Sequence, residues 1–383
     1  MRVKNFLYII VSGLTALLSF CFGVLLTNNM SKTDYAYLQS AIGYAGIPLL
    51  LLPLGMEYIL PNVKKESVGA FFSNYTLVSI LILIFSIFVL SILNLEPQVV
   101  NMTIAYVFSG ITYTAFFEMY GKQLQLSLAN FLALGFQVFV FYYLVTTNVI
   151  PTLAVIVAYL FGNLSRLSLH YMFLRRIGLK SFKIHQLEQF YIAFKHIGLP
   201  MIGVSLIGFT FGGFIRILLE SGEILAELGV IFQVVSLFTF WYGLIDKIYR
   251  YDLIKDLSKV IFTRYLFFLV MPVFIFYVIT SSVNLFSLIW GKNYSELDSL
   301  SGVISLFLLS ISFKHVTNII SNSVGKSRVL FFVNILSAIV FIVLVFCNTP
   351  SVVYLVGSIT FAYTLTFCLT IILNFDSLYF KRI

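Results

Sequence analysis

The strongest constraint on this 383-residue chain is a succession of apolar stretches separated by short polar loops. We count roughly twelve such stretches, and ~20 apolar residues in a helix are enough to cross the hydrocarbon core of a bilayer. Only 10% of the residues are charged, against about 25% in a soluble domain. Backbone groups inside a bilayer must pair with one another, which favours helices. The sequence therefore predicts an all-α polytopic membrane protein with no sizeable soluble domain.

The expected spans are residues 5–26, 38–60, 69–93, 99–117, 123–146, 151–174, 196–218, 226–248, 263–282, 299–322, 329–347 and 352–373. The first follows a short basic N-terminus. Its apolar run is too long for the apolar region of a signal peptide, and no small-residue cleavage site follows it. We therefore expect it to be an uncleaved first span.

Lys and Arg gather in every second loop. The basic loops hold Arg2, Lys4, Lys64, Lys65, Lys122, Arg175, Arg176, Lys180, Lys183, Lys195, Lys247, Arg250, Lys255, Lys259, Arg264, Lys326, Arg328, Lys381 and Arg382. The alternate loops hold only Lys32 and Lys292, beside several acids. Because basic residues collect in short cytoplasmic loops, the pattern predicts that both termini are cytoplasmic. The net charge of +9 is part of this topology signal, so it does not indicate a nucleic-acid partner.

The longest connection, 176–195, is basic, and aromatic residues are interleaved with its polar ones. It predicts an amphipathic cytoplasmic linker between an N-terminal six-helix lobe (1–175) and a C-terminal six-helix lobe (196–383). A weak internal repeat agrees with this division: GKQLQLSLAN (121–130) and GKSRVLFFVN (325–334) open the fifth and eleventh spans. Duplicated halves are common in transporters.

Arg166 is the most deeply placed charge in the expected spans. It lies about 12 Å from the inner end of the sixth helix, where a cation costs at least ~2.5–3.5 kcal/mol. Tyr159, Asn163 and His170 follow the same helix face at intervals of three and four residues. Such a stripe forms either an interhelical hydrogen-bond seam or the wall of a cavity. We favour the cavity, because a seam does not need a permanent cation.

The tenth span carries a second polar stripe, which consists of Ser310, Lys314, Thr317, Asn318 and Ser321. Lys314 falls in the inner half of the bilayer. It has either a functional role or the snorkelling conformation of a long basic side chain. His315 points almost a hundred degrees away from it on the helix.

Four other charges lie near the ends of spans. Arg216 closes the seventh span near Glu220 and Glu223 and is expected in a surface ion pair or a gate. Glu57, Glu118 and Asp246 are expected at inner helix ends. Each acid fits a solvated helix end, with gating or coupling as the alternative.

The sequence holds no constellation typical of an enzyme. Its four His form no ligand cluster, and its three Cys all fall inside apolar spans, so neither a metal site nor a disulfide is indicated. No phosphate-binding GxxxxGK[ST] motif is present. We expect no cofactor, and energy from an ion gradient, the membrane potential or a downhill substrate gradient.

Several segments resemble the polysaccharide transporters of the multidrug/oligosaccharidyl-lipid/polysaccharide exporter superfamily, in particular the O-antigen flippases called Wzx. The resemblance rests on MSKTDYAYLQSAIGYAGIPLLLLPLGMEYIL (30–60), FKHIGLPMIGVSLIGFTFGGFIRILL (194–219), LFSLIWGKNYSELDSLSGVISLFLLSISF (285–313) and VGKSR (324–328). One position departs from the family: its seventh helix often ends in Asp-Arg, whereas Ile215 precedes Arg216 here.

The resemblance implies a bacterial inner-membrane flippase that moves undecaprenyl-diphosphate-linked oligosaccharide repeat units by alternating access. Two six-helix lobes would rock around a central cationic cavity. Independently, the residues fit this interpretation, because Arg166 and Lys314 would supply one cation from each lobe to a diphosphate. Tyr159, Asn163, Thr317 and Asn318 would bind sugars. Membrane lipids and other polysaccharide-assembly enzymes are the expected partners.

Two other hypotheses stay open. The first is an enzyme, either a polysaccharide polymerase or a polytopic acyltransferase. A polymerase would be expected to have a large outer loop, and the longest one here is short. The second is a drug/cation antiporter of the same fold, which would need buried acids in the outer half of a lobe. The flippase hypothesis fits the sequence better than either.

Overall fold

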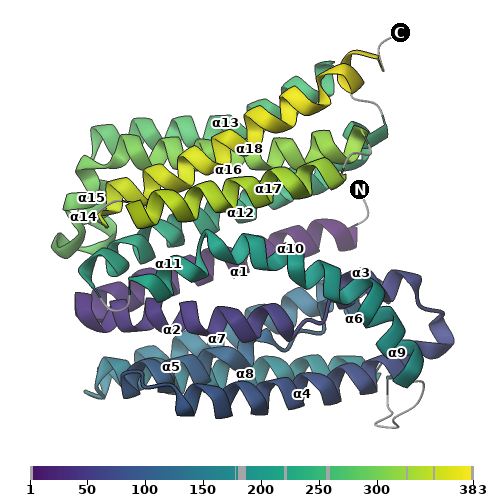
Figure 1. Ribbon diagram of the computed structural model, residues 1–383. Helices are drawn as coiled ribbons and strands as arrows, with labels where there is room; N and C mark the ends of the chain where they lie inside the picture. Colours follow the sequence, from purple (N-terminus) through teal and green to yellow (C-terminus); the bar gives the residue numbers. More distant parts are fainter. Residues whose placement is uncertain are drawn as a thin grey trace. The chain divides into compact units, whose positions relative to one another are not determined.

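The computed structural model describes residues 3–176, 178–179, 187–219, 222–255, 259–324, 327–347 and 350–380. Within these ranges all regular elements are helices (Figure 1). Eleven helices are long and apolar enough to cross a membrane, and a bent pair of helices can make a twelfth span. The predicted all-α polytopic fold is confirmed. The chain divides into two compact units, Met1–Gly222 and Glu223–Ile383, which we describe separately.

Unit 1 contains seven spans, and three of them are built from more than one helix. Its helices are α1 (Val3–Asn29), α2 (Lys32–Leu51), α3 (Met56–Ile59), η1 (Leu60–Asn62), η2 (Lys65–Ser67), α4 (Val68–Ile92), α5 (Pro97–Val107), η3 (Phe108–Gly110), α6 (Thr114–Met119), α7 (Gln123–Thr146), α8 (Pro151–Arg176), α9 (Leu187–Ala193), η4 (Phe194–Gly198), α10 (Leu199–Thr210) and α11 (Gly213–Leu218).

The second span breaks between α2 and α3. Leu54 and Gly55 both have positive φ, at 51° and 65°. A Cβ added at Gly55 would lie 2.6 Å from the Cα of Gly198, so this turn needs a glycine for its conformation and for the close approach of η4. The hydroxyl of Ser79 donates a 3.2 Å hydrogen bond to the carbonyl of Leu52. A side chain thus satisfies a carbonyl that the break leaves without a helical partner.

The fourth span breaks between η3 and α6. The backbone of Ile111 is extended, and Thr112 inside the break is held by Tyr75. The Tyr75 hydroxyl donates to the Thr112 carbonyl at 2.7 Å, and the Thr112 amide lies 3.3 Å from the same oxygen. The break is therefore an ordered feature with its own hydrogen bonds.

The seventh span begins at Leu187 rather than at the expected residue 196, because α9, η4 and α10 form one apolar run through Thr210. Phe190 of α9 is buried against Phe71 of α4, with ring centres 5.5 Å apart. The second half of the expected linker is thus the start of a membrane-length helix. Residues 177 and 180–186 of that linker lie outside the described residues.

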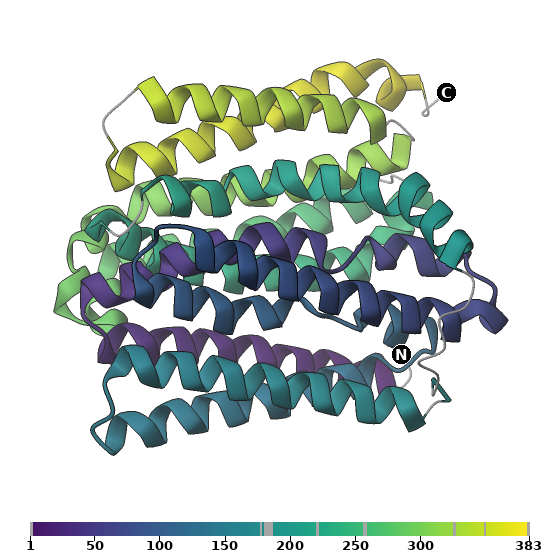
Figure 2. The ribbon, with the colours of Figure 1, turned by 60° about the horizontal axis from the view of Figure 1, so that its bottom comes forward.

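Unit 2 is built around α16. Its helices are α12 (Glu223–Lys255), α13 (Lys259–Ser282), α14 (Leu285–Trp290), η5 (Lys292–Tyr294), α15 (Glu296–Ser299), α16 (Ser301–Val324), α17 (Ser327–Cys347) and α18 (Val352–Phe380). α16 packs against α12, α13, α17 and α18 (Figures 1 and 2). At one end, the carboxylate of Asp298 accepts hydrogen bonds from the amides of Phe286 and Ser287 and caps α14. Capping satisfies amides that the first turn of a helix leaves free.

The two units differ from the two expected lobes by one span. α10 and α11 pack against α2 within unit 1, whereas the sequence places the seventh span at the start of the C-terminal lobe. The close approach of α11 to α2 at Gly43 and Gly213 accounts for this grouping. The division into six-helix lobes at 1–175 and 196–383 stays a prediction.

Candidate functional site

The polar stripe of the sixth span lies on α8 and contacts α5, η3 and α7. Asn163 is buried, and its Nδ2 donates a 3.0 Å hydrogen bond to the carbonyl of Ala105. His170 is also buried, and its Nε2 lies 2.9 Å from Oδ1 of Asn130 on α7. These contacts are those of an interhelical seam, which was the alternative to a cavity wall.

Arg166 binds the broken end of the fourth span. Its Nη2 donates to the carbonyls of Ser109 at 2.7 Å, Phe108 at 3.3 Å and Ile111 at 3.4 Å. These carbonyls close the C-terminal end of α5 and η3, where the helix dipole favours a positive charge. The premise that a seam needs no cation is therefore wrong at this position, because the break exposes several carbonyls inside the membrane.

The contacts of Arg166 with the helix end do not involve all of its N–H donors. The side chain is only half-buried, and its Nε is buried without a hydrogen-bond partner. A guanidinium offers five N–H donors in a planar fork. The Nε donor of Arg166 is thus left without a partner among the described residues. Its predicted role in substrate binding stays a prediction.

Tyr159 contributes an aromatic contact to the stripe. Its ring centre lies 5.2 Å from that of Tyr106 on α5 and 5.9 Å from that of Phe22 on α1. Tyr106 is within electrostatic range of two cations, Arg166 and Arg216. Sequence reasoning missed Tyr106, because a single Tyr in an apolar span gives no periodic signal.

The Arg216 side chain on α11 contacts α2. Its Nε donates a 3.1 Å hydrogen bond to Oε1 of Gln39, which is buried. A Cβ added at Gly43 would lie 2.7 Å from the Cβ of Arg216, so the absent side chain makes room for the arginine. The expected neighbour Glu220 lies outside the described residues. Unit 1 therefore places two guanidinium groups near one tyrosine.

The acids of unit 1 lie apart from this region. Glu57 on α3 and Glu118 on α6 are both exposed, as expected for inner helix ends. They are close enough for their like charges to interact. Their predicted role in gating or coupling stays a prediction.

In unit 2, the stripe of the tenth span lies on α16. Lys314 is half-buried, and its Nζ lies 4.5 Å from the ring centre of Tyr363 on α18, a cation–π geometry. Thr317 is fully buried and donates to the Lys314 carbonyl at 2.6 Å, whereas Asn318 is half-buried. The structure gives Lys314 an aromatic partner, and the predicted substrate contacts of these three residues stay predictions.

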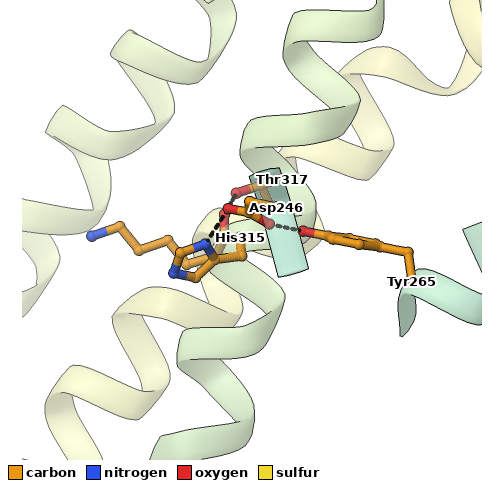
Figure 3. A network of polar contacts seen from close by, with 5 residues as sticks. Asp246, Tyr265, His315 and Thr317 are labelled. Atoms are coloured by element: carbon orange, nitrogen blue, oxygen red, sulfur yellow. Dashed lines mark hydrogen bonds and ion pairs between the residues drawn. The ribbon is translucent and has the colours of Figure 1, made fainter. Parts of the chain in front are cut away.

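The same helix takes part in a polar network that the sequence analysis did not predict (Figure 3). The Nδ1 of His315 lies 2.7 Å from Oδ2 of Asp246 on α12, and the hydroxyl of Tyr265 on α13 donates to Oδ1 at 2.6 Å. Asp246 is thus a partly buried, paired group, with 22% of its side chain exposed, rather than a solvated helix end. The only sequence signal for this network was the presence of an Asp and a His within apolar spans. Because 69 residues separate them, their pairing could not be predicted.

The described part of the chain contains no group of three or more His, Cys, Asp or Glu side chains that could hold a metal ion. The Asp246 network does not resemble a metal site either. Both carboxylate oxygens already accept hydrogen bonds from a hydroxyl and an imidazole.

Comparison with solved structures identifies the fold. The structure is similar to the inward closed conformation of the lipid II flippase MurJ, with a TM-score of 0.64 and 12% identity over 96% of this chain and 87% of that one. It is also similar to an inward-facing multidrug resistance MATE family transporter of the MOP superfamily, with a TM-score of 0.61 and 12% identity over 96% of each chain.

A mutant of the Vibrio cholerae MATE transporter VcmN gives a TM-score of 0.55 at 12% identity, over 98% of this chain and 99% of that one. No family model matches the sequence, and no curated protein matches it. The chain therefore has the fold of these flippases and transporters, none of which is an enzyme by its description. At 12% identity this likeness shows the fold alone.

Proposed function

We propose that this chain is a flippase of the bacterial inner membrane, with both termini cytoplasmic. Its proposed substrates are undecaprenyl-diphosphate-linked oligosaccharide repeat units of the O-antigen or capsule type, translocated by alternating access. The fold supports a transporter, since a lipid II flippase and MATE transporters share it. The resemblance of residues 30–60 and 194–219 to polysaccharide transporters supports the substrate class.

The observation that carries the proposal is the half-buried guanidinium of Arg166, with a buried Nε that has no hydrogen-bond partner. A charge inside a membrane protein marks a substrate or ion pathway by default. Arg166 lies at a discontinuous helix, and discontinuous helices are a common setting of transporter binding sites. A diphosphate is the ligand that a guanidinium fork binds best, through paired charge-assisted hydrogen bonds.

Arg216 supplies a second cation in the same unit. Arg166 and Arg216 are both within electrostatic range of Tyr106. Two positively charged side chains therefore lie near the same tyrosine of unit 1. We propose that they share the two phosphate groups, with Tyr106 and Tyr159 beside the sugars. Lys314 stays a proposed further contributor from unit 2. The lipid tail would remain in the bilayer, and other polysaccharide-assembly enzymes stay proposed partners.

The test is a deletion of the gene, followed by extraction of lipid-linked intermediates. We expect lipid-linked repeat units to accumulate in the inner leaflet and the surface polysaccharide to disappear. A plasmid copy of the wild type restores the polymer, and Arg166→Lys, which keeps a cation and a donor at this position, does not. Normal polymer in the deletion strain would refute the proposal. Loss of one sugar modification with normal export would indicate an acyltransferase instead.

A drug/cation antiporter is the second candidate, and one observation favours it. Asp246 is a partly buried acid in unit 2, whereas the sequence predicted a solvated inner helix end at this position. Sensitivity to cationic dyes distinguishes the two functions. A deletion strain that becomes dye-sensitive, with unchanged polysaccharide, would favour the antiporter.

A further inference from the structure

The Asp246 network joins three helices of unit 2 through ionisable side chains. Asp246 lies on α12, His315 on α16 and Tyr265 on α13 (Figure 3). The carboxylate accepts from both neighbours, at 2.7 Å and 2.6 Å. The ring of Tyr242 packs beside His315, with centres 5.3 Å apart. The site is partly open, since 18% of the His315 side chain and 22% of Asp246 are exposed.

The geometry points to a proton as the ligand. His315 uses Nδ1 for the carboxylate, so its Nε2 is the atom that gains or loses a proton. A metal cation would need several oxygen ligands, whereas both oxygens of Asp246 already accept hydrogen bonds. His is the side chain whose ordinary titration falls between pH 5 and 8. We propose that Asp246, His315 and Tyr265 form a proton-binding site that couples proton movement to transport.

The charge of the site explains how a proton would act. With neutral His315 the network carries one negative charge, and with protonated His315 it carries none. A net charge is costly within a membrane, so the protonated network is the form that can be closed off from water. The deprotonated form favours an arrangement in which α12, α13 and α16 leave the carboxylate hydrated.

Other charged and titratable side chains lie near the Asp246 network in the described part of unit 2. Arg264 precedes Tyr265 on α13 and is exposed. Tyr249 of α12 packs on the ring of Tyr265, with ring centres 6.2 Å apart. Lys314 of α16 is next to His315 in sequence, but it lies over Tyr363 of α18. Among the described side chains, His315 is the ionisable base that contacts the Asp246 carboxylate, at 2.7 Å.

A first experiment tests proton binding without any transport substrate. The purified full chain has four His, so selective 15N-histidine labelling gives a simple spectrum in detergent. We expect the imidazole signal that is lost in His315→Gln to respond to pH in the wild type and to change in Asp246→Asn. His196→Gln, at an exposed position of η4, is the matched control and keeps that signal. A His315 signal that stays unchanged from pH 5 to 8 would overturn the proposal.

A second experiment tests coupling, and this part rests on the proposed function. Proteoliposomes carry a lipid-linked oligosaccharide, an imposed pH gradient and a clamped membrane potential. One-for-one exchange changes the steady-state distribution of substrate about tenfold per pH unit, since one pH unit is a tenfold ratio of protons. We expect this dependence in the wild type and His196→Gln, and its loss in His315→Gln and Asp246→Asn, which still equilibrate substrate.

The outcomes of the two experiments are distinguishable. If the wild type moves no lipid-linked substrate while His315 titrates, the proposed function fails and proton binding stands. If both variants keep the gradient dependence of the wild type, the coupling role is refuted. Should His315→Gln fold poorly, Asp246→Asn keeps the shape of the side chain and tests the same role.

Discussion

The Nη2 of Arg166 lies 2.7 Å from the carbonyl oxygen of Ser109, which joins the sixth span to the broken end of the fourth. Through this contact, Arg166 does two things in the membrane. It satisfies carbonyls that the break would leave without partners, and it keeps a positive charge near Tyr106. The structural role of Arg166 and its proposed role in transport can be separated by substitution.

Arg166→Ala is expected to destabilise the protein. The carbonyls of Phe108, Ser109 and Ile111 lose their donor, and a buried unsatisfied group costs about 1–3 kcal/mol. Thermal unfolding in detergent measures the loss. Arg166→Lys keeps a cation and a donor, so it is expected to recover much of the stability. It will not restore surface polysaccharide, because an ammonium lacks the planar fork. Full polysaccharide from the lysine variant would show that charge alone suffices.

Arg216 and Gln39 are expected to be energetically coupled. A hydrogen bond to a charged group contributes about 1.5–3 kcal/mol, and the bond between these two side chains is 3.1 Å long. A double-mutant cycle with Arg216→Leu and Gln39→Leu measures the coupling from thermal unfolding of the four proteins. The double mutant is expected to lose less stability than the sum of the single losses. Additive losses would show that the pair contributes nothing to the folded state.

The spans could be predicted from sequence with little error. Residues 69–93 and 123–146 were expected as helices, and α4 and α7 cover 68–92 and 123–146. Hydrophobic length decides these boundaries, because the bilayer fixes how many apolar residues a helix needs. The seventh span began earlier than expected, at Leu187. The aromatic and aliphatic residues of α9 join the apolar run despite the polar residues among them.

The tertiary partners could not be predicted. Nothing in the pattern shows that Arg166 reaches the carbonyls of η3, because the break in the fourth span contains no proline to mark it. Asp246 and His315 were each noticed, but their pairing depends on how α12 and α16 pack. Charge positions along single helices are readable from sequence. The partner of each charged side chain depends on how the helices pack, which the sequence pattern does not show.

The orientation of the chain in the membrane is a separate prediction. Lys64 and Asn293 are both exposed, and the distribution of Lys and Arg places the first inside and the second outside. With Cys21, Cys347 and Cys368 replaced by Ala, single cysteines at these two positions can be labelled with a membrane-impermeant maleimide. Asn293→Cys is expected to react in intact cells, and Lys64→Cys only after permeabilisation. The opposite pattern would invert the topology and place both termini outside.

The contact between α2 and α11 is expected to tolerate no side chain at Gly43. A Cβ there would lie 2.7 Å from the Cβ of Arg216 and 3.1 Å from the carbonyl oxygen of Gly213. Gly43→Ala must therefore push the helices apart, and such overpacking costs about 1–3 kcal/mol. Gly135→Ala is the matched control, because a Cβ at Gly135 on α7 meets nothing within 4 Å. Alanine is the better helix former by about 1 kcal/mol, so this variant is expected to be at least as stable as the wild type. Thermal unfolding in detergent measures both variants, and equal effects at the two glycines would contradict the packing of α2 on α11.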